Sequence, residues 1–207
     1  MLANHLKPRR FAVLGRSGGG PHALAAAALL PDRCRGAATI AGVAPFGADG
    51  LDWFAGMGAE NVIEFGAAVT GEPALSAYLE KEAAALTAIR PEDVAAALGD
   101  LVSDVDKAAL TGDFAAFMAE SFRASVSTGF AGWRDDDLAF AADWGFALDG
   151  FAAPISIWQG DQDRMVPFDH GRWLAGHMPG ARVRLLPGEG HLSLGVTRFD
   201  DVLAGLR

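Results

Sequence analysis

The sequence has little cysteine and a shortage of positive charge. Cys34 is the only cysteine in 207 residues, so no disulfide can form within the chain. A reducing compartment fits best, and we expect a cytoplasmic protein in which Cys34 is a small buried hydrophobic residue. Lys and Arg number 17 against 26 Asp and Glu, a net charge of -9. Binding to nucleic acid or to an anionic membrane is disfavoured, because no basic field exists to attract phosphates.

Long hydrophobic runs are also missing. No apolar segment approaches the roughly 20 residues that a membrane-spanning helix requires. Apolar residues nevertheless make up 51% of the chain and charged residues 21%, which is typical of a packed globular protein. The sequence shows no internal repeat and no low-complexity linker.

Short apolar runs of the kind found in buried parallel strands occur in two separate parts of the chain. They cover residues 11–15, 36–45, 153–160 and 181–188. Helical patterns follow several of these runs, at 18–30, at 167–178 and at 196–206. Alternating strands and helices predict an α/β fold with a parallel sheet and helices on both faces. We expect residues 1–48 and 150–207 to form this core.

The segment between the two parts, residues 49–149, has helical spacing throughout. We expect helices over 72–89, 91–102, 112–126 and 135–148, and no strand among them. This segment is therefore predicted to be a helical cap. Its aromatic side chains either line a pocket for an acyl or aromatic group or serve ordinary helix packing: Phe114, Phe117, Phe122, Trp133, Trp144 and Phe146.

The stretch FAVLGRSGGG, residues 11–20, places a serine between a strand and a helix. Gly15, Ser17 and Gly19 fit the pattern G-x-S-x-G of a nucleophile elbow. A serine on such a tight turn takes a strained backbone, and we expect side chains two residues to either side to clash. The following helix start offers the Gly18 N–H to a developing oxyanion. The alternative is a glycine-rich turn for packing or phosphate, but neither G-x-G-x-x-G nor a Walker lysine is present.

A serine nucleophile needs a base and an orienting acid. His191 follows the last predicted strand, where a loop could carry it over the carboxyl edge of the sheet. Asp163 follows the preceding strand in a loop, whereas Asp161 is expected to brace the turn. His170 and His177 are expected on the surface of a helix. The order Ser17, Asp163, His191 is the chain order of a hydrolase triad on this kind of sheet.

These motifs and their spacing resemble the α/β-hydrolase superfamily, with kinship to its proline-iminopeptidase-like branch. The resemblance runs over nearly the whole chain and implies Ser17 as nucleophile, His191 as general base and then acid, and Asp163 as the orienting group. It also implies a helical cap over residues 49–149, a small-molecule acyl substrate, and no metal or organic cofactor.

Two features depart from the family pattern. Arg16 stands next to the nucleophile, where an aromatic residue, His or Glu is common; it could meet an acidic partner in Asp135–Asp137 or lie in solvent. Only about ten residues precede the elbow strand, and they contain no HG-type loop to supply a second oxyanion N–H. We therefore expect an N-terminally truncated sheet. Its open edge at 11–15 favours homo-oligomerisation.

Two hypotheses follow. The first is a serine hydrolase that cleaves an ester or amide bond through an acyl-enzyme. The second is a truncated, weakly active or inactive homologue that serves as a binding or oligomerising module. A haloperoxidase-like activity without cofactor would use the same triad, whereas a dehalogenase would need an aspartate in place of Ser17.

Overall fold

A single four-stranded parallel sheet organises the computed structural model, which describes residues 5 and 9–206. The strands lie in the order of the chain, with parallel pairing throughout: β1 (Phe11–Arg16), β2 (Cys34–Ile40), β3 (Ile155–Gly160) and β4 (Arg182–Leu186). The predicted α/β class is confirmed. The second strand ends earlier than expected, because Ala41 takes a left-handed backbone with φ of 51°.

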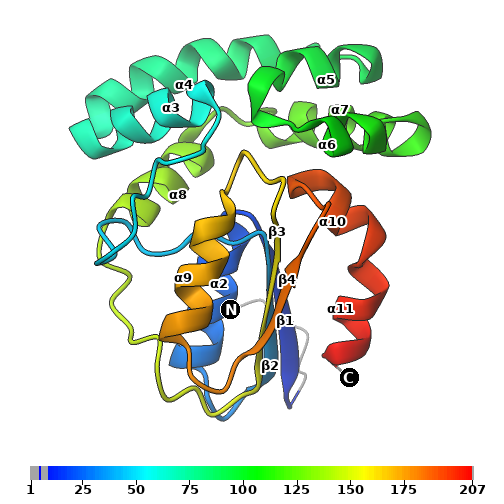
Figure 1. The fold of residues 1–207 in the computed structure, drawn as a ribbon. Helices are drawn as coiled ribbons and strands as arrows, with labels where there is room; N and C mark the ends of the chain where they lie inside the picture. The colour runs from blue at the N-terminus through cyan, green and yellow to red at the C-terminus, as the bar shows by residue number, and fades with distance from the viewer. Residues whose placement is uncertain (1–4, 6–8, 207) are drawn as a thin grey trace.

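Helices cover both faces of the sheet (Figure 1). On one face lie α2 (Gly19–Leu29) and α9 (Phe168–His177); on the other lie α10 (His191–Thr197) and α11 (Phe199–Gly205). Side chains alternate between the two faces along each strand and so contribute to two separate hydrophobic cores. Ile155 and Ile157 pack with Leu24 and Leu174 under the first pair of helices, while Trp158 packs with Ile40, Leu194 and Val202 under the second pair.

A helical segment separates β2 from β3 and lies over one end of the sheet (Figure 1). It comprises α3 (Ala59–Thr70), α4 (Glu72–Leu86), a 3₁₀ turn (Pro91–Asp93), α5 (Val94–Ala97), a second 3₁₀ turn (Gly99–Leu101), α6 (Asp104–Ala109), α7 (Gly112–Ser125) and α8 (Ala131–Ala141). The predicted helical insertion is confirmed, with no strand of the sheet inside it.

Three helix boundaries differ from the prediction. The expected helix over 91–102 is broken into short pieces, and left-handed Gly99, with φ of 52°, interrupts it. The helix expected over 135–148 begins earlier and ends at Ala141, because Ala142 is extended. The terminal helix expected over 196–206 is two helices, α10 and α11, that meet at Arg198.

Cys34 is fully buried at the start of β2, as predicted. Among the helices in the described part of the chain, none is long and apolar enough to cross a membrane.

Candidate active site at the carboxyl edge of the sheet

Ser17 occupies a sharp turn between β1 and α2. Its φ of 53° places a non-glycine residue in the left-handed region, which costs conformational energy and is common at functional sites. Two hydrogen bonds fix the turn: Ser17 N donates to the Ile40 carbonyl at 2.8 Å, and Gly20 N donates to the Ser17 carbonyl at 2.9 Å. The predicted strand–turn–helix setting of the serine is therefore present.

The glycines around this turn differ in what they do. A Cβ on Gly15 would lie 1.9 Å from the Gly19 carbonyl oxygen, so the first glycine of the motif is sterically required. A Cβ on Gly19 would meet no atom within 4 Å, so the expected clash on that side is wrong. The close approach falls instead on Gly20, whose Cβ would lie 2.9 Å from Gly42 Cα, where α2 passes the end of β2.

Asp163 and His191 are in direct contact. His191 Nδ1 lies 2.9 Å from Asp163 Oδ2 and 3.1 Å from Oδ1, and both side chains are buried. The carboxylate is held by the backbone N–H groups of Met165 and Val166, at 2.9 and 2.8 Å, and by Gln159 Nε2 at 3.0 Å. An ionised carboxylate only accepts, so it favours the His191 tautomer with the proton on Nδ1. Nε2 is then the free basic nitrogen.

His191 begins a helix instead of standing in a loop. It is the first residue of α10, directly after Gly190, and its side chain still reaches the carboxyl edge of the sheet. The predicted location after the last strand is correct, and the predicted loop is wrong. A helix start fixes the direction of the imidazole more firmly than a loop would, because its backbone is bonded to the following turn.

Ser17 and His191 line the same cavity. This cavity, about 290 Å³, lies between the sheet edge and the helical segment. Its apolar lining comes mostly from the helical segment and the loop after β3, and it includes Leu98, Leu101, Met118, Phe122, Trp133 and Met165. Among the described residues, no hydrogen bond joins Ser17 to His191. Catalytic hydrogen bonds of this kind often tighten only when substrate binds.

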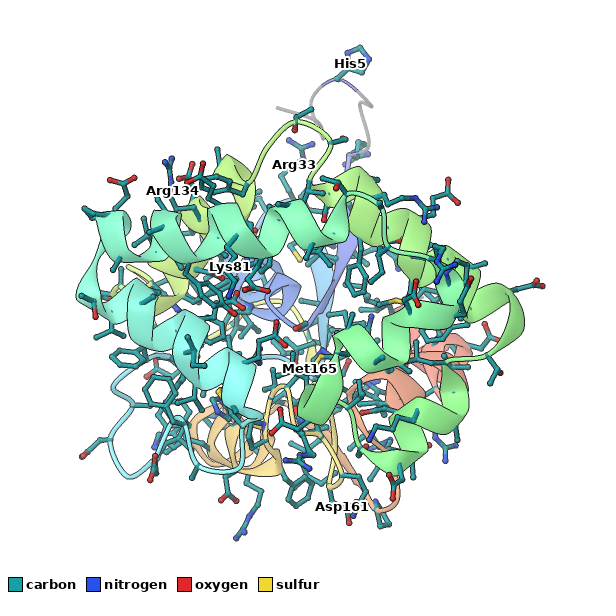
Figure 2. The ribbon with its side chains drawn as sticks, turned by 90° about the horizontal axis from the view of Figure 1, so that it is seen from above. His5, Arg33, Lys81, Arg134, Asp161 and Met165 are labelled. Carbon is teal, nitrogen blue, oxygen red and sulfur yellow. The ribbon has the colours of Figure 1, made fainter. Side chains whose placement is uncertain are left out.

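A second cavity, about 500 Å³, also borders Ser17. Gly18, Phe140 and Asp137 belong to its lining, and Met165 borders both cavities. In the view onto the cap, Met165 lies between α3 and α4 on one side and α5–α7 on the other (Figure 2). Gly18 precedes α2 as its N-cap residue, where backbone N–H groups have no partner within the helix. Ser17 thus borders two cavities.

Arg16 turns toward the histidine rather than toward Asp135–Asp137. Its Nη2 donates to the His191 carbonyl oxygen at 3.3 Å. Burial lowers the pKa of Arg16, while the charges of Asp163 and Asp106 act in the opposite direction. The predicted partner in Asp135–Asp137 is wrong, because those residues lie on α8, where Asp135 pairs with Arg134 and Asp136 with His22.

The cap aromatics divide between lining and packing. Phe122 and Trp133 border the cavities at Ser17, whereas Trp144 and Phe146 stack on each other at a separate hollow beside α2. Phe114 and Phe117 stack on α7, with Phe117 exposed to solvent. Phe122 and Trp133 thus line a cavity, as one alternative requires, while a pocket for an acyl or aromatic group stays a prediction.

Sequence reasoning missed a buried pair of carboxyl groups in the cap. Glu64 on α3 and Asp137 on α8 are 8% and 3% exposed, and both border the Ser17 cavity. Burial raises the pKa of Asp137 to about 9, with the charge and hydrogen bond of Glu64 adding to the effect. Burial also raises the pKa of Glu64, which accepts a hydrogen bond from Trp133 Nε1 at 2.7 Å. Two contacting carboxyl groups of this kind share one proton.

His170 is also a buried polar residue. It is 1% exposed, so the predicted surface position is wrong, while His177 is exposed as expected. Ala44 N donates to His170 Nδ1 at 3.1 Å, and Nε2 lies 2.9 Å from the Trp53 carbonyl oxygen. The ring therefore joins α9 to the loop after β2. Burial lowers the pKa of His170, which favours this neutral state.

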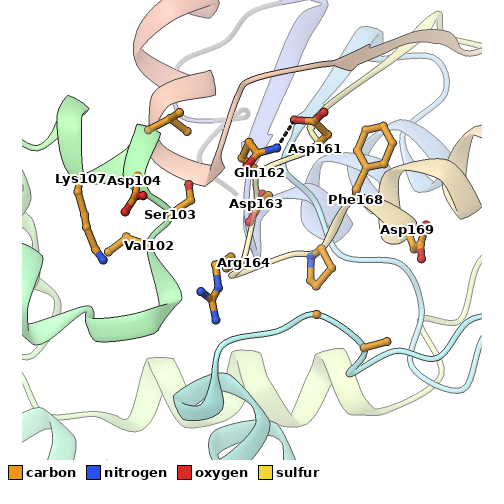
Figure 3. Close-up of a pocket in the computed structure, with 14 residues that line it drawn as sticks. Val102, Ser103, Asp104, Lys107, Asp161, Gln162, Asp163, Arg164, Phe168 and Asp169 are labelled. Atoms are coloured by element: carbon orange, nitrogen blue, oxygen red, sulfur yellow. Dashed lines mark hydrogen bonds between the residues drawn. The ribbon is translucent and has the colours of Figure 1, made fainter.

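A polar hollow of about 540 Å³ lies between the loop after β3 and α6 (Figure 3). Asp161 belongs to its lining and accepts hydrogen bonds from Gly188 N and Gln162 Nε2, at 2.8 and 3.1 Å. The predicted bracing role of Asp161 is confirmed. Among the described residues, no group of three or more His, Cys, Asp or Glu side chains could hold a metal ion.

The alpha/beta hydrolase fold family model matches residues 1–196. The chain belongs to this family. No curated protein sequence shows significant similarity to it.

Solved structures of hydrolases have the same fold. A meta-cleavage product hydrolase from Pseudomonas fluorescens IP01 is 16% identical, with a TM-score of 0.63. The matched region covers 99% of this chain and 67% of the hydrolase. A bromoperoxidase from Bacillus anthracis is 22% identical with a TM-score of 0.60, covering 99% and 70%. An alpha/beta hydrolase fold protein from Nakamurella multipartita is 25% identical with a TM-score of 0.56, covering 99% and 71%. The chain thus spans about two thirds of the length of the first structure.

Proposed function

We propose that this protein is a serine hydrolase that cleaves an ester or amide bond of a small acyl substrate. The observation that carries the proposal is the contact of His191 Nδ1 with the buried Asp163, beside a cavity that His191 shares with a strained Ser17. Membership of the alpha/beta hydrolase fold family supports it. Ser17, His191 and Asp163 are the proposed catalytic residues, with Gly18 N–H as an oxyanion donor.

In the proposed reaction, Ser17 Oγ attacks the substrate carbonyl carbon while its proton passes to His191 Nε2. The carbonyl oxygen becomes an oxyanion that the Gly18 N–H stabilises. Collapse of this intermediate breaks the bond to the leaving group, which takes the proton from His191, and an acyl-serine remains. Water then gives a proton to His191 and attacks the acyl carbon, which releases the acid and restores Ser17. Asp163 stabilises the imidazolium in both halves.

The cavity favours an apolar acyl group. Met118, Phe122, Leu98 and Leu101 supply much of its lining, and its volume of about 290 Å³ suits a small molecule. The narrower assignment to the proline-iminopeptidase-like branch stays a prediction, as does a cytoplasmic location.

Active-site labelling tests the proposal. A fluorophosphonate probe should label the folded wild-type protein at Ser17, and p-nitrophenyl esters of graded chain length should be hydrolysed. The variant Ser17→Ala should lose both, while Ser127→Ala, which changes an exposed serine just after α7, should keep both. Absence of labelling in folded wild-type protein would refute the hydrolase.

The second hypothesis, a weakly active or inactive binding module, has one specific observation in its favour. Ser17 and His191 share a cavity without a hydrogen bond between them, and Gly18 is the single oxyanion donor that we assign. One missing donor typically reduces kcat by about 10²–10³-fold. The β1 edge would then serve association of identical chains, which light scattering tests: a monodisperse monomer would contradict it.

A further inference from the structure

Asp106, on α6 of the cap, has no part in the reaction described above, yet it contacts the backbone of the proposed general base. Its carboxylate is completely buried. Oδ2 accepts a hydrogen bond from His191 N at 3.0 Å, and Oδ1 accepts from Leu192 N at 2.8 Å and from Ser193 N at 2.9 Å. Three consecutive amides at the start of α10 thus converge on one side chain from a distant part of the chain.

The fit around this carboxylate is tight. A Cβ on Gly190 would lie 2.4 Å from both carboxylate oxygens of Asp106, so the glycine before His191 makes room for the acid. Ser103 Oγ donates to Oδ2 at 3.1 Å and holds the carboxylate from its own side. The amides at a helix start otherwise need side chains or water, and here a buried acid satisfies them.

Both backbone polar groups of His191 are therefore held by charged side chains. The N–H is bound by Asp106 from the cap, and the carbonyl oxygen is bound by Arg16 from the elbow. The imidazole is attached to the backbone between these two contacts, and its Nδ1 lies 2.9 Å from Asp163 Oδ2. A change in the backbone at this point would move Nε2 relative to Ser17.

We propose that Asp106 is a positioning residue: it fixes the backbone of His191 so that the imidazole meets Asp163 and presents Nε2 to the Ser17 cavity. The inference rests on the proposed function for its kinetic meaning, and its geometric part stands without it. Through Asp106 the cap would then help to position the proposed general base, in addition to covering the site.

The test compares Asp106→Asn with Asp104→Asn, which makes the same chemical change on an exposed residue of the same helix. The amide presents a donor where the carboxylate accepted, so the three backbone contacts are no longer all satisfied. We expect kcat for p-nitrophenyl ester hydrolysis to fall by about 10- to 100-fold in Asp106→Asn, as misplacement of a catalytic group does. KM should change less than kcat, and Asp104→Asn should behave as wild type.

Proton NMR supplies a readout that does not depend on turnover. The proton between His191 Nδ1 and Asp163 should give a far-downfield resonance in the wild type and in Asp104→Asn. Ser17→Ala should show the same resonance, because it leaves both His191 and Asp163 unchanged. In Asp106→Asn it should be lost or shifted upfield. If wild-type protein neither reacts with the fluorophosphonate nor turns over ester, the proposed function fails, and this resonance alone decides the positioning role.

A folded Asp106→Asn that keeps both the resonance and wild-type kcat overturns the inference. If Asp106→Asn does not fold, Ser103→Ala decides, since it removes only the hydroxyl that supports the carboxylate. The expected result there is a fall in kcat with an unchanged KM and a broadened downfield resonance. No change in either measurement overturns the inference.

Discussion

The buried carboxyl pair in the cap predicts a pH-dependent stability that one substitution should remove. Asp137 has a pKa of about 9 in the folded protein against an ordinary value of 3.8, and burial is the main cause. Between these two values the folded protein holds a proton that the unfolded chain releases. The free energy of unfolding therefore decreases as the pH rises from about 4 to 9, by about 1.4 kcal/mol for each pH unit.

Asp137→Asn makes this position neutral at every pH and lets an amide donate to Glu64. The penalty that wild type accumulates between pH 5 and 8, up to about 4 kcal/mol for one proton, should then largely disappear. Urea unfolding, followed by tryptophan fluorescence at pH 5, 6, 7 and 8, measures the free energy of unfolding of wild type and variant. The stability of the variant relative to wild type should increase steadily with pH.

Asp135→Asn is the matched control. Asp135 lies on the same helix, is exposed and pairs with Arg134 in contact with solvent, so its loss should change the free energy of unfolding very little. This cost should not vary over the same pH range. Parallel stability curves for wild type and Asp137→Asn would refute the shared proton.

Further predictions concern the elbow and the buried histidine. Gly15→Ala should abolish folding or reduce soluble yield sharply, because its Cβ would overlap the Gly19 carbonyl, whereas Gly19→Ala should leave the melting temperature equal to or above that of wild type. His170→Ala should reduce the free energy of unfolding by about 1–3 kcal/mol in urea titrations at pH 7.5, since Ala44 N–H and the Trp53 carbonyl lose their partner. Because burial lowers the pKa of His170, the unfolded chain binds the proton first as the pH falls below about 6.5, so the contribution of His170 to the free energy of unfolding decreases there. The stability of His170→Gln relative to wild type should therefore increase as the pH falls from about 7 to about 5.5, and a difference that stays constant over this range would contradict the reasoning.

Much of the fold was predictable because its patterns are local. The apolar runs of all four strands and the elbow of Gly15 and Ser17 depend on neighbouring residues, and each has a steric or hydrophobic cause. Asp163 and His191 could be paired because each follows a strand, and parallel strands end at the same edge of a sheet.

The remaining contacts depend on tertiary packing. Nothing in the sequence around Asp106 indicates that α6 would lie against the start of α10, and nothing near His170 indicates that the ring would meet the loop at Ala44. Glu64 and Asp137 stand in amphipathic helices where a solvated acid is the ordinary expectation. Gly190, directly before His191, is a signal of the contact with Asp106, because a glycine at this place leaves space for another group.

The order of pairing in the sheet has a consequence for how the chain folds. β1 pairs with β2, and β3 pairs with β4, across short connections, whereas Ala37 of β2 meets Ile155 of β3 with the whole cap between them. The two strand pairs can therefore form early and independently, and joining them is the event with the largest loop-closure entropy. Since this entropy grows only logarithmically, doubling the length of the cap would add about 0.6 kcal/mol. The sheet can therefore accept caps of very different size at little cost in stability.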